Sequence, residues 1–211
     1  MTSLAHLRPA WVLAVSLVLL VSCKPNEIKT LLEPSQTLGV VMAEEAIHAA
    51  GANKKIAVIS HDEAWGPPST VEQAFDAAVE KQGFSTVVVK SANLGDPMRR
   101  HQIGLQPDDF FEAVQKAADA GAIVSFVGAP LLTTGDIARL APSHPPILII
   151  AITAMGAQLG VPGNPGRLAG LLDAKVIQAA IVNGVSEASS DKTDATHRLF
   201  AQNYSILRPP R

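Results

Sequence analysis

The sequence is poor in cysteine, in aromatic residues and in charge. A single cysteine among 211 residues leaves no disulfide within the chain, so the fold must be stabilised by packing. Charged residues make up 17% of the chain and the formal net charge is -2. Nucleic acid is therefore not an expected partner, because binding a polyphosphate needs a concentrated basic surface. Aromatic residues make up only 4%, which argues weakly against a carbohydrate site lined by several stacked rings.

The common patterns of catalytic, metal and nucleotide sites are also missing. The sequence contains no G-x-S-x-G, no G-x-G-x-x-G, no G-x-x-x-x-G-K-[ST] and no H-E-x-x-H. His61, Asp62 and Glu63 are consecutive, so we expect their side chains to diverge rather than converge on a metal. We therefore expect a protein that is not an enzyme and that holds no cofactor and no metal.

The first residues have the pattern of an export signal. Arg8 precedes an apolar run at residues 11–20, which is too short to cross about 30 Å of hydrocarbon as a helix. The residues that end at Cys23 read L-V-S-C and resemble the bacterial lipobox. An ordinary cleaved signal with an incidental thiol and a retained membrane anchor are the two alternatives.

The lipobox resemblance implies a division of the chain and an attachment to a membrane. Residues 1–22 are then a signal peptide, residues 23–33 a lipidated tether that starts at the acylated Cys23, and residues 34–211 a single α/β domain. Two or three acyl chains hold a protein firmly at a membrane, whereas one chain binds only marginally. Lys24 stands where an aspartate retains enterobacterial lipoproteins at the inner membrane, so the outer membrane is slightly favoured.

Apolar runs alternate with helical patterns along the rest of the chain. The first helix is predicted from a cap at Ser35 or Thr37 to Gly51, and the second starts at the capping-box pair Ser69 and Glu72. Further helices are expected at 107–120, at 135–140 and from about 168, and an amphipathic segment at 196–207 closes the chain. Strands are predicted at 55–60, 84–90, 122–127, 147–152 and 179–182.

This alternation predicts an α/β fold. We expect an open, mostly parallel, doubly wound sheet of about five strands in three α/β/α layers. Because both faces of such a sheet are covered, its strand side chains should have no solvated side. The residues predicted to be buried are Val58, Ile59, Val88, Val124 and Phe126.

Three blocks of sequence carry a resemblance to a known family. They read I-A-V-I-S-H-D-E-A-W-G from residue 56, A-F-D-A-A-V-E-K-Q-G-F from residue 74 and A-I-V-S-F-V-G-A-P from residue 122. Together they resemble one lobe of a type I periplasmic binding protein, a family that includes receptors for branched-chain amino acids and for sugars. The resemblance implies a periplasmic-binding-protein-like single lobe that binds or senses a solute. Members of the family clamp their ligand between two lobes, whereas this chain has residues for one.

A ligand of such a sheet is expected in the crevice beyond the carboxyl ends of the strands. We predict a pocket in which Asp62 is a fixed acceptor and Trp65 an apolar wall. The complete predicted set of ligand-binding residues is Asp62, Trp65, Gly128, Ala129, Pro130, Thr153 and Met155. In the alternative interpretation Asp62 caps a turn, Trp65 covers the edge of the sheet, and Gly128 and Pro130 are only loop residues. The Gly- and Pro-rich segment 153–166 is a candidate flap over the pocket.

Two functions fit these patterns. The first is a lipid-anchored extracytoplasmic module that binds or senses a small polar solute, with the membrane as a partner through Cys23 and a further membrane or envelope protein as a second partner. The alternative is a structural or interaction lipoprotein of the bacterial envelope without a small-molecule site. The basic cluster Arg99, Arg100 and His101 is either a grip for a phosphate or anionic partner or a solvated loop face.

The predicted anchor is tested by replacing Cys23 with serine. The Cys23→Ser variant should lose metabolic labelling with a fatty acid and be released in soluble form, because the thiol is the predicted acylation site. A variant that still sediments with membranes after a carbonate wash would show that the lipoprotein interpretation is wrong.

Overall fold

The computed structural model describes residues 25–62, 67–92, 105–140, 143–152, 165–184 and 194–210. The chain divides into two units, one up to Glu33 and one from Pro34 to Arg211. The described helices are α2 (Pro25–Ala50), α3 (Thr70–Lys81), α4 (Pro107–Lys116), α5 (Thr134–Arg139), α7 (Pro165–Asp173) and α8 (Ala195–Asn203). The described strands are β1 (Lys55–His61), β2 (Ser85–Ala92), β3 (Ala122–Ser125), β4 (Ile147–Ala151), β5 (Ala179–Asn183) and β6 (Tyr204–Leu207). Among these helices none is long and apolar enough to cross a membrane.

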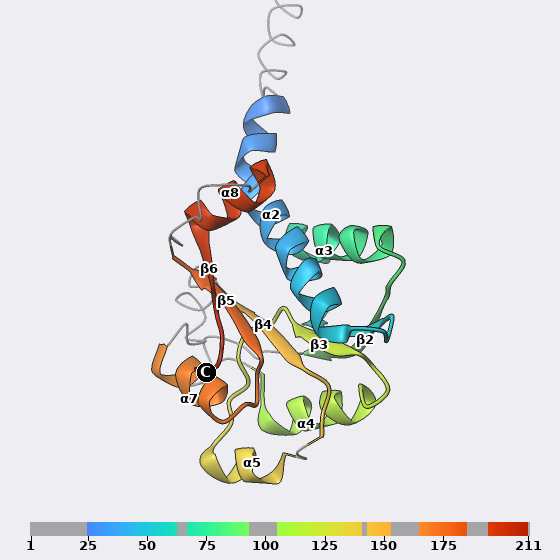
Figure 1. The fold of residues 1–211 in the computed structure, drawn as a ribbon, viewed down its shortest axis with the longest axis vertical. Coiled ribbons are helices and arrows are strands. Elements are labelled where there is room, and N and C mark those ends of the chain that lie inside the picture. Colours follow the sequence, from blue (N-terminus) through green and yellow to red (C-terminus); the bar gives the residue numbers. More distant parts are fainter. Residues whose placement is uncertain are drawn as a thin grey trace, which may run out of the picture. The chain divides into compact units, whose positions relative to one another are not determined.

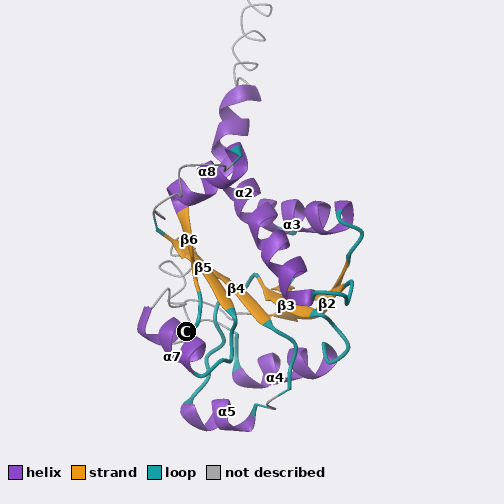
Figure 2. Ribbon diagram, in the orientation of Figure 1, coloured by secondary structure: helices purple, strands orange, loops and turns teal. Residues whose placement is uncertain are grey.

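The strands form one mostly parallel sheet. Their order among the described residues is β2-β1-β3-β4-β5-β6. Parallel pairs join β1 to β2 and to β3, β3 to β4, and β4 to β5, whereas β6 runs antiparallel to β5. Figure 2 shows these strands as one layer with helices on either side. The predicted α/β class, with its mostly parallel doubly wound sheet, is confirmed.

Helices cover both faces of the sheet (Figure 1). One face packs against α2, α3 and α8, which contribute Leu38, Phe75 and Phe200 to a buried cluster. The other face packs against α4 and α7, which contribute Phe110 and Leu171 to a second buried cluster, with α5 on the same side. Burial of apolar surface on both faces is the main favourable contribution to folding of such a three-layer domain.

Helix α2 begins at Pro25, so the predicted cap at Ser35 or Thr37 is wrong. Pro34 lies inside the helix, and the buried Thr37 hydroxyl donates a hydrogen bond to the Pro34 carbonyl oxygen at 2.8 Å. Thr37 therefore bonds a carbonyl within the helix instead of capping its first N–H groups. The P-S-Q-T sequence has the composition of a helix start, but the same composition also occurs where a helix continues through a proline.

The predicted amphipathic segment 196–207 consists of two elements. Helix α8 ends at Asn203, and strand β6 begins at the next residue. The Tyr204 N–H still donates to the Phe200 carbonyl of the last helical turn, and the two rings pack with centroids 5.5 Å apart. Because the strand follows the helix directly and no Gly or Pro marks the boundary, the sixth strand was not predicted.

Four of the five predicted core residues are buried, namely Val58, Ile59, Val124 and Phe126, but the prediction for Val88 is wrong. The Val88 side chain is 57% exposed. Strand β2 lies at the edge of the sheet and pairs only with β1, so its side chains have strand neighbours on one flank only. The register of the pair also shifts next to Val88, as in a β-bulge.

Truncation of Phe126 tests the packing of the sheet. Its ring is 8% exposed and meets Phe75 of α3 edge to face, with centroids 5.2 Å apart. Phe126→Ala should lower the free energy of unfolding by about 3–5 kcal/mol, measured by urea denaturation. Val88→Ala is the matched control, with an expected loss under about 1 kcal/mol because the side chain is exposed. Equal losses in the two variants would contradict the packing described.

His197 connects α8 to α2. Its Nε2 lies 2.8 Å from a Glu44 carboxylate oxygen, and its Nδ1 lies 3.0 Å from a carboxylate oxygen of Asp194, the N-cap of α8. The hydrogen bond to Asp194 raises the pKa of His197, partial burial opposes this rise, and Glu44 adds to it. Arg208, which follows β6, makes a second link to α2 by pairing with Glu45 at 2.9 Å.

Stability should depend on pH through His197. Because its folded pKa lies above the unfolded value of about 6.5, its contribution is complete below that pH and is lost as the pH rises through the folded pKa. His197→Gln should therefore be less stable than the unmodified protein at about pH 5.5, with the difference shrinking by about pH 8.5. Urea denaturation of both proteins measures this, and a difference independent of pH would contradict it.

Candidate functional site

The order of the strands reverses between β1 and β3. From β1 the chain crosses to β2 on one side, and from β2 it returns to β3 on the other. In a doubly wound sheet of this order the ligand crevice lies beyond the carboxyl ends of the strands at the reversal. Asp62 directly follows β1, and residues 128–130 follow β3. The structure thus places these predicted site residues at the ends of two neighbouring strands.

Backbone hydrogen bonds hold these strand ends together. The Phe126 N–H donates to the Ile59 carbonyl at 2.9 Å, and the Asp62 N–H donates to the Ala92 carbonyl of β2 at 3.1 Å. The Asp62 side chain is half-buried beside this junction. Outside the described residues lie the other three predicted site residues, Trp65, Thr153 and Met155, and their part in the site stays a prediction.

A buried carboxylate ties the start of α3 to the end of β1. Glu72 is only 5% exposed, and its carboxylate accepts hydrogen bonds from the Ser60 hydroxyl, the Ser69 N–H at 3.0 Å and the Ser69 hydroxyl at 3.2 Å. The Ser69 hydroxyl also accepts a bond from the Glu72 N–H at 3.2 Å, which completes the predicted capping box. The sequence identified this pair as a cap but gave no signal that Ser60 would join it.

His61 lies at the end of β1 beside this carboxylate. Partial burial lowers the pKa of His61, and the negative charge of Glu72 opposes that shift. The imidazole is therefore mainly uncharged at neutral pH. Within the described ranges, no three His, Cys, Asp or Glu side chains gather in a way that could hold a metal ion.

The loop after β3 is held by bonds within the chain. Residues 126–130 are buried, and the Ser125 hydroxyl donates to the Gly128 carbonyl at 3.0 Å. Gly128 has a φ of 85°, a conformation that favours glycine. The Leu131 N–H then donates to the Leu105 carbonyl at 2.8 Å. These contacts support the alternative interpretation in which Gly128, Ala129 and Pro130 are structural, and ligand contact through them stays a prediction.

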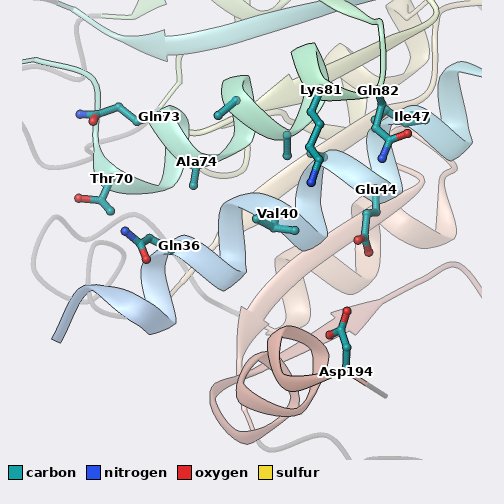
Figure 3. A pocket seen from close by; sticks show the side chains of 13 residues that line it. Gln36, Val40, Glu44, Ile47, Thr70, Gln73, Ala74, Lys81, Gln82 and Asp194 are labelled. Atoms are coloured by element: carbon teal, nitrogen blue, oxygen red, sulfur yellow. The ribbon is translucent and has the colours of Figure 1, made fainter. Parts of the chain in front are cut away.

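A groove that was not predicted from the sequence lies between α2 and α3. It has a volume of about 680 Å³ and is lined by residues of these two helices together with Gln82, the C-cap of α3, and Asp194. Figure 3 shows Gln36, Thr70 and Gln73 towards one end, and Lys81 and Gln82 towards the other. Because no strand residue lines it, this groove is distinct from the predicted site at the carboxyl edge of the sheet.

The fold is similar to that of solved structures, whereas comparisons of the sequence found no match. No family model matches the chain, and no curated protein matches it. The fold is similar to that of AraP, an arabinose-binding protein from Geobacillus stearothermophilus, with a TM-score of 0.51 and 11% identity over 83% of this chain and 61% of that chain. A chain described as a LacI transcriptional regulator from Bacteroides fragilis gives a TM-score of 0.44 and 12% identity over 80% of this chain and 50% of that one.

These likenesses define the class of fold and no more. The chain spans less than two-thirds of the length of AraP, and at 11% identity only the fold is shown. The fold is periplasmic-binding-protein-like, which confirms that part of the sequence resemblance.

The Glu72 link is tested by comparing two substitutions. Glu72→Ala should lower the free energy of unfolding by about 1–3 kcal/mol, because it removes a cap and leaves the Ser60 hydroxyl without its partner. Glu72→Gln should lose less, since a glutamine side chain can still serve a capping box. Thermal denaturation measures both, and an unchanged melting temperature in Glu72→Ala would show that the buried bonds contribute nothing.

Proposed function

We propose that this protein is a lipid-anchored extracytoplasmic module that binds or senses a small polar solute. The observation that carries this proposal is the reversal of strand order between β1 and β3, with Asp62 and the loop at 128–130 at the two strand ends. Ligands of doubly wound sheets bind at such a reversal, where loops rather than regular elements provide the contacts. The likeness of the fold to that of an arabinose-binding protein supports the proposal.

The proposed ligand is a small polar molecule rather than a large apolar one. The polar residues Ser60, His61 and Asp62 are consecutive where β1 ends, and side chains of these types form hydrogen bonds. AraP is an arabinose-binding protein, so sugars are a reasonable first group to test. Small-molecule sites usually bury 70–90% of a drug-sized ligand's surface, so a solute in a crevice at this edge needs a cover. We propose that the segment 153–166 or a second chain closes it.

The proposed location is the bacterial envelope, and it depends on Cys23. The L-V-S-C sequence supports acylation there, and Lys24 slightly favours the outer membrane over the inner one. Residues 24–33 then connect the acylated cysteine to the domain that starts at Pro34. No catalytic role is proposed, because no sequence pattern suggests one and AraP is a binding protein.

The alternative is an interaction lipoprotein that keeps the fold without the pocket. Two observations favour it. The loop at 128–130 is buried and bonded within the chain, and the edge strand β2 exposes Val87 and Val88. An exposed edge strand can pair with another chain, so this surface suits a protein partner.

A thermal-shift screen with sugars, amino acids and nucleosides separates the two functions. A solute at 100 times its dissociation constant should add about 2.7 kcal/mol of stability. Because Trp65 is the sole tryptophan after Cys23, its fluorescence should change on binding. Asp62→Ala should weaken binding by about 1–3 kcal/mol through loss of an acceptor.

Asp173→Ala is the matched control for Asp62→Ala. Asp173 is an exposed aspartate at the end of α7, the helix that precedes β5. It therefore lies towards the end of the sheet where the parallel strands begin, away from the proposed site, and its removal should not change binding. If no solute shifts the melting temperature, the interaction lipoprotein becomes the better conclusion.

A further inference from the structure

Two helices begin at the edge of the sheet where the solute is proposed to bind. Helices α3 and α4 follow β1 and β2, so in a parallel sheet their first turns lie at its carboxyl edge. A free helix N-terminus attracts anions, because its first N–H groups are unpaired and its dipole is positive there. The charge of a suitable solute therefore depends on whether these termini are free.

The first turn of α3 carries a buried carboxylate of the chain itself. Glu72 accepts the Ser69 N–H at 3.0 Å and is 5% exposed, with the Ser60 hydroxyl bonded to its other oxygen. An anionic solute at this terminus would lose the donors that Glu72 already uses and would be repelled by its charge. The neighbouring His61 contributes no compensating positive charge at neutral pH, because burial lowers its pKa.

The terminus of α4 is similarly unsuited to an anion. Pro107 opens the helix without an N–H, and Asp108 and Asp109 lie in its first turn. Lys90, near the carboxyl end of β2, is 2.6 Å from Asp109 and 2.6 Å from Glu112. Its charge is therefore already balanced by two carboxylates. After β3, the Thr133 N–H is likewise bonded to a carboxylate within the chain.

We propose that the site at the carboxyl edge selects solutes that donate hydrogen bonds and carry no anionic group, and that Glu72 determines this selectivity. The inference rests on the proposed function, because it concerns the same site. Neutral polyhydroxyl compounds and cations are the solutes that the site should accept. Phosphate esters and carboxylates are the solutes that it should reject. Asp62 adds a further carboxylate at this edge.

Matched pairs of solutes test the selectivity in the unmodified protein. Each pair has one charged group added to a common frame: an aldose with its uronic acid, an aldose with its phosphate ester, and an amino acid amide with its amino acid. Where a pair binds, the member without the added negative charge should bind about tenfold more tightly, because like charges about 10 Å apart repel at the effective dielectric of a protein surface. Added sodium chloride should narrow this ratio by screening.

Glu72→Gln tests the residue that is proposed to set the ratio. Glutamine keeps the length of the side chain and an acceptor for the cap but removes the charge. In this variant the dissociation constants of the two members of each pair should differ by about threefold or less. The control is Glu80→Gln, an exposed glutamate near the other end of α3, which should keep the original ratio. A folded Glu72→Gln variant that keeps the original ratio of dissociation constants would show that Glu72 does not set the selectivity. The effect of sodium chloride on that ratio is measured in the unmodified protein and needs no variant.

The outcomes separate this inference from the proposed function. Anions that bind as tightly as their neutral partners would overturn the selectivity while leaving a solute site in place. A variant with Arg99→Ser and Arg100→Ser gives a second check. If the unmodified protein binds an anion and this variant does not, the arginines after β2 attract the anion, and the proposed selectivity is wrong. Absence of binding by every pair would overturn both proposals.

Discussion

Strand β1 is bonded on both sides, and this double pairing determines where the rest of the domain can lie. Its register with β2 and with β3 places the ends of three strands side by side. The chain goes from β1 to β2 on one side and then from β2 to β3 on the other side of β1. The order of the strands therefore reverses beside β1. In doubly wound sheets a reversal of this kind is where the connecting loops diverge and ligands bind, and the proposed site is placed at this edge for that reason.

The start of α3 shows how one local pattern contributes to both stability and selectivity. The S-T-V-E sequence positions a glutamate to cap its own helix, and the Ser60 hydroxyl near the end of β1 donates to the same carboxylate. Burying Glu72 is tolerable because both of its oxygens accept hydrogen bonds. The same bonds leave a negative charge at a helix terminus that many related folds keep free for an anion.

The sequence predicted local features better than those that depend on neighbouring strands. The capping box at Ser69 and the strands β1 and β4 follow from residues close in the chain, and the structure agrees with them. The exposure of Val88 depends on β2 being an edge strand, which no local pattern encodes. The start of α2 was not predicted because the segment with Pro34 and Thr37 fits a helix start as well as a helix interior. Of the site, the positions of Asp62 and residues 128–130 beyond the strands could be predicted, but not the bond from Ser60 to Glu72.

The position of the binding site is the central claim, and amide chemical-shift mapping tests it most directly. The solute that raises the melting temperature most would be titrated into isotope-labelled protein. We expect the largest changes at Asp62, Gly128 and Ala129, at the ends of β1 and β3. Changes confined to the groove between α2 and α3, at Gln73 and Lys81 for example, would place the ligand elsewhere and contradict the claim.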